Sequence, residues 1–159
     1  MSRARLEEIA ITEAAPRDAD ALRCLHAYYA ELARRFPGGF DVTLSRDPDS
    51  VDMVPPRGTF LVALSDGHPL GCVALKGDGS KTGEIKRLWI APAARGMGLA
   101  TRLMKTAEDR ARSLGMTTLR LDTNRTLGEA IALYRSTGWT EIPAFNTEPY
   151  AHHWFEKRL

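Results

Sequence analysis

The stretch WIAPAARGMGLATRLM, residues 89–104, joins an apolar, strand-like run to the beginning of an amphipathic helix. Arg95, Gly96 and Gly98 stand where that helix begins. The first amide N–H groups of a helix lack intrahelical partners, and the helix dipole places partial positive charge there. Glycines remove the side chains that would keep an anion from those amides. The pattern predicts an anion-binding turn, to which Arg95 adds charge and Thr101 a hydroxyl.

Other interpretations of this motif stay open when it is taken alone. Its glycines would also serve a simple tight turn that needs positive φ angles. The dinucleotide fingerprint G-x-G-x-x-G fails at its third position, Thr101, and only Asp122 downstream favours a dehydrogenase. The Gly-Lys-Ser/Thr of a P-loop is missing. In the anion-binding interpretation, Arg102 and Lys105 on the following helix would extend positive charge toward the ligand.

The composition indicates an ordinary soluble globular protein. The chain has 159 residues, of which 43% are hydrophobic and 26% charged, with a net charge of +2. We expect one domain over residues 1–159. The balanced charge argues against a nucleic-acid partner. No apolar run approaches the ~20 residues that cross a bilayer, and residues 1–14 lack the apolar centre of a signal peptide. We therefore expect no membrane association and a cytoplasmic location.

The two cysteines, Cys24 and Cys72, lie far apart in apolar segments. Such cysteines in a cytosolic protein are typically buried and reduced, so we expect no disulfide bond.

Hydrophobic periodicity predicts a single α/β domain without internal repeats. The Asp66-Gly67 turn predicts an antiparallel hairpin between two short strands. Residues 42–58 are polar and contain prolines, which indicates a loop or short helix on the surface. The expected strands are 9–14, 59–64, 69–77, 84–92, 117–123, 139–145 and 150–159, and the expected helices are 16–36, 99–114 and 127–138.

Three segments together resemble the GNAT superfamily of acetyl-CoA-dependent N-acetyltransferases. They are EIKRLWIAP at 84–92, RGMGLATRLM at 95–104 and LYRSTGW at 133–139. The family's pyrophosphate loop reads Arg/Gln-x-x-Gly-x-Gly/Ala, which residues 95–100 match. The resemblance covers most of the chain and implies a twisted, mixed, mostly antiparallel sheet flanked by helices.

The resemblance also implies a co-substrate, acetyl-CoA, and its binding residues. The loop amides would hold the pyrophosphate, and the end of the preceding strand would pair with the pantetheine arm. Many relatives carry an asparagine where Leu127 stands, and Asn124 is the candidate substitute. The expected coenzyme-binding residues are Leu88, Trp89, Ile90, Arg95, Gly96, Met97, Gly98, Leu99, Ala100, Thr101 and Asn124.

Two residues are catalytic candidates because relatives use these residue types at these places. Tyr134 would serve the departing thiolate as general acid, and a packing role is its alternative. Glu84 would act as base, directly or through water, and a solvated glutamate is its alternative. A bulge near Leu88, as relatives have, would change which strand residues share a face.

The acceptor pocket is harder to place. His152 and His153 are adjacent in a strand, so their side chains point to opposite faces and cannot chelate one ion. We expect no metal site there, and one histidine facing the acceptor cleft. Further candidates for that cleft are Asn146, Tyr150, Tyr28, Tyr29 and Phe36, while Arg125 would meet a coenzyme phosphate or remain solvated.

The expected function is transfer of acetyl from acetyl-CoA to a primary amine of a small molecule by direct attack. A protein acceptor and a non-catalytic coenzyme-A-binding module are the alternatives. A homodimer is an assembly that the sequence allows.

Overall fold

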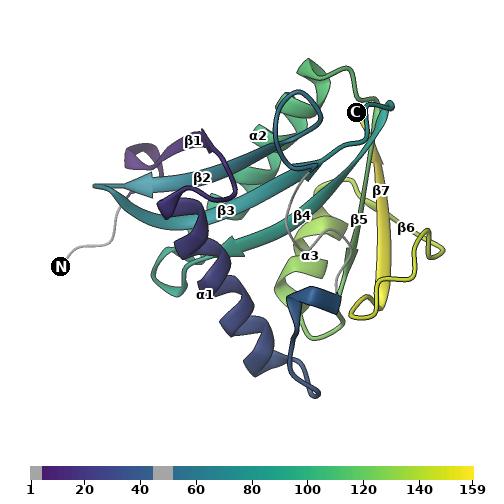
Figure 1. Ribbon diagram of the computed structural model, residues 1–159, viewed down its shortest axis with the longest axis horizontal. Helices are drawn as coiled ribbons and strands as arrows, with labels where there is room; N and C mark the ends of the chain where they lie inside the picture. The colour runs from purple at the N-terminus through teal and green to yellow at the C-terminus, as the bar shows by residue number, and fades with distance from the viewer. Residues whose placement is uncertain (1–4, 45–51) are drawn as a thin grey trace.

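The computed structural model describes residues 5–44 and 52–159, which form one mixed sheet flanked by helices (Figure 1). The sheet order is β1-β2-β3-β4-β5-β7-β6. The strands are β1 Ala10–Ala14, β2 Thr59–Ser65, β3 His68–Lys76, β4 Thr82–Ile90, β5 Thr118–Thr123, β6 Thr140–Ile142 and β7 His153–Arg158. The helices are α1 Ala19–Arg35, α2 Leu99–Ser113 and α3 Gly128–Ser136, with short 3₁₀ turns at Leu6–Glu8, Val42–Leu44 and Pro92–Ala94.

The order of elements agrees with the sequence-based prediction, and the differences lie at the ends. Helix α1 begins at Ala19, after the extended N-cap residue Asp18. The Asp18 carboxylate accepts a hydrogen bond from the Ala15 amide at 2.9 Å and so fixes the turn before the helix. The closing strands are shorter than predicted, and the chain between them runs through turns. Within residues 42–58, the predicted short helix is a 3₁₀ turn at Val42–Leu44, and residues 45–51 lie outside the described part.

The two faces of the sheet are covered by different helices, as strict alternation along β2 requires. Phe60 and Val62 pack toward α1 with Cys24 and Cys72, whereas Leu61 and Ala63 belong to the core under α2. Both cysteines are free and buried, as predicted. Burial raises the pKa of the Cys72 thiol well above its ordinary value, so this sulfur stays protonated and unreactive.

One strand pair breaks the antiparallel pattern and opens the sheet. Strands β4 and β5 run parallel, and they pair only from Thr82–Glu84 to Thr118–Arg120. Beyond Glu84 the two strands separate, and the carboxyl end of β4 is left without a ladder partner on that side. Ligands of open α/β sheets bind at the carboxyl ends of strands where neighbours part.

A β-bulge near the end of β4 changes the direction of the side chains that follow. Cys72 pairs with Trp89 and Ala74 with Lys86, so one residue of β3 faces two of β4. Arg87, within the bulge, has a φ of 57°. The bulge lies where the resemblance implied one, and it shifts the alternation of the strand between Lys86 and Trp89.

Candidate active site

The loop before α2 presents the helix amides to an open cavity. Gly98 is the N-cap residue with a φ of 87°, and no side chain hydrogen-bonds the first turn there. Gly96 has a φ of 79°, and a side-chain carbon built on it would meet nothing within 4 Å. The amides of Leu99, Ala100 and Thr101 precede the first intrahelical donor, Arg102, whose N–H reaches the Gly98 carbonyl at 3.1 Å. This geometry suits an anion.

The loop residues Gly96 and Gly98 and the first helical residues, Leu99 to Thr101, line a cavity of about 360 Å³, here called the coenzyme cavity. Its other walls come from the end of β4, from α1 and from α3. The structure brings all of the predicted coenzyme-binding residues to this cavity except Met97 and Asn124. Met97 packs against the core beneath α2 instead.

The cations of this region are held by protein groups. The Arg95 guanidinium lies 2.5 Å from Glu31, and its Nε donates to the Ile90 carbonyl at 3.0 Å. Arg35 pairs with Glu31 and with Glu129, so α1, α3 and the loop before α2 are joined across the cavity. The pairs Arg35–Glu129 and Arg95–Glu31 join distant parts of the chain, so the pattern of charges in the sequence could not reveal them.

The two cations on α2 do not act together as predicted. The Arg102 guanidinium donates to the carbonyls of Leu6 and Ile9, at 2.8 and 2.6 Å, and so fastens the segment before β1. Lys105 is exposed, and among the described residues neither Arg102 nor Lys105 lines the coenzyme cavity or the cavity beside it. The prediction that they extend charge toward the ligand is therefore wrong for Arg102.

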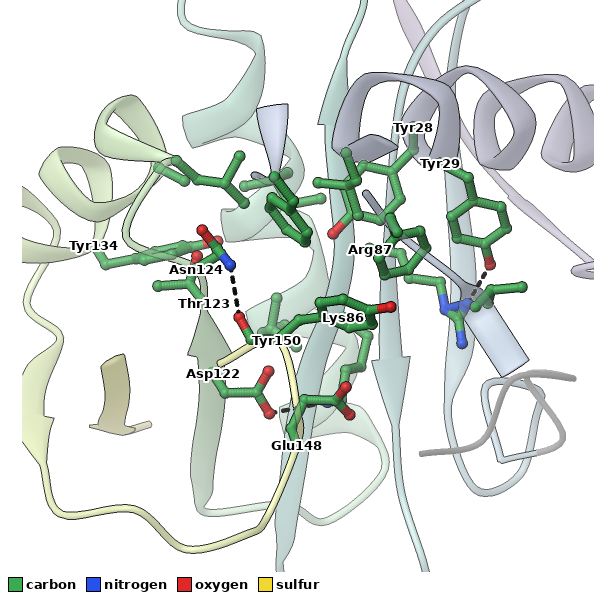
Figure 2. Close-up of a pocket in the computed structure, with 18 residues that line it drawn as sticks. Tyr28, Tyr29, Lys86, Arg87, Asp122, Thr123, Asn124, Tyr134, Glu148 and Tyr150 are labelled. Carbon is green, nitrogen blue, oxygen red and sulfur yellow. Dashed lines mark hydrogen bonds and ion pairs between the residues drawn. The ribbon is translucent and has the colours of Figure 1, made fainter. Parts of the chain in front are cut away.

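A second cavity, of about 110 Å³, lies between the parted strands and is here called the acceptor cavity (Figure 2). Its apolar wall includes Phe36, Phe40 and Tyr150, whose rings are 4.8–5.9 Å apart between centroids. The Tyr150 hydroxyl accepts a hydrogen bond from the Asp41 amide at 2.9 Å, which ties the segment after α1 to the chain before β7.

The polar part of the acceptor cavity carries charges of both signs. Asp122, at the end of β5, lies 3.1 Å from the Lys86 ammonium and accepts from the Asn146 amide at 2.8 Å. Arg87 bonds the Tyr29 hydroxyl and lies against the Tyr29 ring, 5.8 Å from its centroid. The bulge at Arg87 therefore accompanies a buried guanidinium in the cavity wall.

Tyr134 projects from α3 into the acceptor cavity (Figure 2). Its ring packs against Trp139 and Phe155, with centroids at 6.0 and 5.8 Å. Burial raises the pKa of the Tyr134 phenol above its ordinary value, and the nearby Asp122 carboxylate raises it further. The hydroxyl therefore stays protonated near neutral pH and remains a hydrogen-bond donor.

Two predicted site residues lie elsewhere than expected. Glu84 is in the paired part of β4, 3.4 Å from Lys86, and does not line either cavity. Asn124 is in the wall of the acceptor cavity rather than the coenzyme cavity. Its amide donates to the Tyr150 carbonyl at 2.8 Å and accepts from Thr126, so it holds the chain in place.

The two histidines bond to neighbouring protein groups. The His152 ring accepts from the Arg125 amide at 3.1 Å, and His153 lies 2.7 Å from Glu141. Neither histidine is among the described residues that line the coenzyme cavity or the acceptor cavity, so the histidine expected at the acceptor cleft is not found in its wall. Asn146 does not line either cavity; its side-chain amide donates a hydrogen bond to Asp122 and accepts one from the Trp154 indole, which holds Asp122 in place. Among the described residues, no group of three or more metal-ligating side chains occurs.

The site contains functional candidates that sequence reasoning did not assign. Asp122 was considered only for a dinucleotide, although its place at the end of a strand beside the cleft is a usable signal. Tyr28 and Tyr29, which the sequence offers only as further candidates for the acceptor cleft, both line the acceptor cavity. Helical spacing alone does not say which face of α1 meets a gap in the sheet.

No helix within the described ranges is long and apolar enough to span a membrane.

Comparison with known proteins agrees with this geometry. The model of the acetyltransferase (GNAT) family matches residues 25–139. An uncharacterised N-acetyltransferase of Schizosaccharomyces pombe is 34% identical over 145 residues, covering 87% of this chain and 83% of the relative. An IAA acetyltransferase of Azospirillum brasilense is 36% identical over 104 residues, which cover 64% of this chain and 66% of the relative.

Solved structures show the same fold. A GNAT-family acetyltransferase from Staphylococcus aureus superposes with a TM-score of 0.83 at 15% identity, covering 95% of this chain and 99% of that one. The PaiA N-acetyltransferase of Thermoplasma acidophilum, solved in complex with coenzyme A, superposes with a TM-score of 0.72 at 18% identity. The match covers 95% of this chain and 99% of that one. The chain therefore belongs to the GNAT family of acetyltransferases.

Proposed function

We propose that this acetyltransferase moves the acetyl group of acetyl-CoA to a primary amine of a small molecule by direct attack. The observation that carries the proposal is the meeting of two cavities at the carboxyl end of β4. One has helix amides free for an anion at its mouth, and the other is walled by aromatic rings and charged groups. A thioester entering by the first and an amine entering by the second would meet at Leu88, which lines both.

The coenzyme cavity offers backbone groups that acetyl-CoA could use. Its diphosphate would accept hydrogen bonds from the amides at the beginning of α2, where Gly96 and Gly98 leave the backbone accessible. Its pantetheine arm would run along the unpaired edge of β4, at Leu88, Trp89 and Ile90. The family's expected co-substrate therefore agrees with the residues present.

The acceptor amine needs a group that orients its nitrogen and a route for its proton. Asp122 offers a carboxylate in the cavity wall that an amine N–H could reach. Glu84 is outside the cavity and would act as base only through intervening water. In this scheme Asp122 orients the amine, and a water chain that ends at Glu84 carries the proton away.

Tyr134 would serve the departing sulfur. A phenol with an ordinary pKa near 10 is less acidic than a thiol at ~8.5, and the raised pKa of Tyr134 widens that difference. Hydrogen bonding to the sulfur as negative charge develops is therefore a better role than early proton transfer. In this proposal the two reactants are held together by the cavities, and positioning supplies most of the rate enhancement.

The small size of the acceptor cavity supports a small-molecule acceptor. About 110 Å³ between rings and charges leaves room for a short amine rather than for a folded surface. The names of relatives point the same way, since one is an aminoalkylphosphonate N-acetyltransferase from Salmonella typhimurium, 25% identical over 118 residues. A protein substrate would have to insert a single side chain.

The test is amine-dependent release of coenzyme A from acetyl-CoA. A panel of amino acids, aminoalkylphosphonates, polyamines and arylalkylamines should include acceptors that release thiol and form N-acetyl product in equal amounts. A lysine peptide mixture serves as the protein-like comparison. Turnover with the peptides and none with the small amines would overturn the assigned acceptor class.

A further inference from the structure

The coenzyme cavity and the acceptor cavity share a small set of lining residues. They are Tyr28, Leu32, Leu88, Leu127 and Ala130. Among these described residues, Tyr28 is the one with a polar side chain. The acetyl carbonyl must lie at this junction, because the thioester arrives from one side and the amine from the other. Tyr134 lines the acceptor cavity and not the coenzyme cavity.

The four tyrosines of the chain divide into two kinds. The hydroxyls of Tyr29 and Tyr150 are bonded within the protein, to Arg87 and to the Asp41 amide. The hydroxyls of Tyr28 and Tyr134 have no hydrogen-bond partner in the described part of the structure. Neither hydroxyl is among the fully buried, unpartnered polar atoms of the described residues, so both face the open space of the acceptor cavity. Two donors that no protein group engages are therefore available there to a bound ligand.

The two hydroxyls approach the cavity from opposite walls. Figure 2 shows Tyr28 reaching in from α1 and Tyr134 from α3, with their hydroxyl ends directed toward the space between them. Although the Tyr28 side chain as a whole is half-buried, burial of its hydroxyl raises the pKa of the phenol, and proximity to Tyr134 raises it further. Both phenols therefore remain neutral donors at the pH of the reaction.

We propose that Tyr28 is a second catalytic tyrosine, whose hydroxyl donates a hydrogen bond to the carbonyl oxygen of the acetyl thioester. This role rests on the proposed function. When the amine nitrogen attacks the carbonyl carbon, the C=O π pair moves to oxygen and an oxyanion forms. The O–H of Tyr28 keeps its proton and binds that oxyanion more strongly than the ground-state carbonyl.

Collapse of the intermediate completes the step. The oxygen lone pair re-forms the C=O bond, and the C–S bond breaks with its electron pair on sulfur. The nitrogen loses one proton through water to the base. The sulfur leaves as a thiolate that accepts a hydrogen bond from Tyr134, and it takes a proton from solvent water as coenzyme A is released. Each tyrosine then meets one of the two atoms that gain negative charge, which explains why two donors face each other across the junction.

The experiment measures thiol release from acetyl-CoA with hydroxylamine, a small amine that is neutral at pH 7.5 and does not depend on the natural acceptor. Tyr28→Phe should lower kcat ~10²-fold or more, the effect of removing one oxyanion donor. Its dissociation constant for acetyl-CoA, measured by calorimetry, should stay within threefold of wild type. Tyr28→3-fluorotyrosine keeps the ring and gives a more acidic donor, so it should retain wild-type kcat or exceed it.

Two results would overturn the role. One is Tyr28→Phe with kcat within threefold of wild type, which would assign the oxyanion to backbone amides. The other is a fluorotyrosine variant as slow as Tyr28→Phe, which would show that the loss comes from packing. If Tyr28→Phe does not fold, the kcat of the fluorotyrosine variant still tests the role, because a value far below wild type would contradict it. Failure of the proposed function is distinct, because wild-type protein would then bind no acetyl-CoA or release no thiol with any amine, and the role would fall with it.

Discussion

The guanidinium of Arg95 lies 2.5 Å from Oε1 of Glu31, so the arginine of the glycine-rich loop is tied to α1. Its Nε also donates to the Ile90 carbonyl, 3.0 Å away. The side chain is 40% exposed, and ion pairs this accessible contribute little, ~0.2–1 kcal/mol. Arg95 therefore lines the coenzyme cavity as a paired group, and under the proposed function the helix amides, rather than this arginine, would bind the diphosphate.

We expect Arg95→Ala to weaken acetyl-CoA binding by less than about tenfold, or ~1.4 kcal/mol, because the amides and the helix dipole remain. Glu31→Gln is the matched variant. It frees the guanidinium from its carboxylate, so binding should stay equal or become tighter. Calorimetry at low salt measures both. A loss of a hundredfold or more in Arg95→Ala would mean that the arginine itself binds the diphosphate.

Gly98→Val should abolish measurable acetyl-CoA binding, since the new side chain occupies the space of the phosphate. The backbone strain of such a change can be separated from this effect. Gly98 and Gly79 have φ angles of 87° and 90°, and the space around both is open, with Leu6 at 3.8 Å from a carbon on Gly98 and nothing within 4 Å at Gly79.

Gly79→Val is therefore the control for Gly98→Val. Left-handed backbone costs a non-glycine residue ~1–2 kcal/mol, so the two variants should lose similar amounts of melting temperature. Only the variant at Gly98 should lose the coenzyme. Equal binding by the two folded variants would remove the anion site from the beginning of α2.

Tyr134→Phe removes one hydroxyl and keeps the ring between Trp139 and Phe155. If the hydroxyl serves the sulfur, kcat should fall ~10²-fold, while coenzyme affinity and melting temperature change little. Because its pKa is raised above the ordinary value of ~10, the wild-type phenol should stay protonated up to at least pH 9.5. Full activity of the variant would leave Tyr134 with a packing role.

Asp122→Asn tests how the amine is held. The change keeps the shape of the side chain and removes its charge, so kcat/KM for the acceptor should fall ten- to a hundredfold, as expected for a lost charged hydrogen bond of ~1.5–3 kcal/mol. The dissociation constant for acetyl-CoA should not change. Glu84→Gln, outside the cavity, should have a smaller effect. A larger loss of kcat/KM in Glu84→Gln than in Asp122→Asn would favour Glu84 as the direct base.

Much of the fold could be predicted from local sequence. The glycine loop, the amphipathic α2 and the hairpin at Asp66-Gly67 each depend on backbone conformation and short-range periodicity, which neighbouring residues determine. Asp66 and Gly67 indeed both have positive φ, at 50° and 75°. The coenzyme cavity was largely predicted for the same reason, because its loop is one continuous segment.

The acceptor cavity was harder because its walls come together from distant segments. Tyr28 and Tyr134 are separated by more than a hundred residues, and only the parting of β4 from β5 makes them face each other. Asn124 was assigned to the coenzyme by its proximity to Leu127, yet its amide bonds the Tyr150 carbonyl, a contact that no spacing in the sequence indicates. Glu84 lines neither cavity because it lies in the part of β4 that pairs with β5, and the extent of that pairing could not be predicted from the sequence.

Amine-dependent thiol release by the wild-type protein, compared with Gly98→Val and Gly79→Val, tests the central claim most directly. We predict that wild type and Gly79→Val release coenzyme A in step with N-acetylation of a small amine, and that Gly98→Val releases none. Acetyl-CoA binding by wild type without amine-dependent release from any small amine or peptide would contradict the claim and leave a coenzyme-binding protein without catalysis.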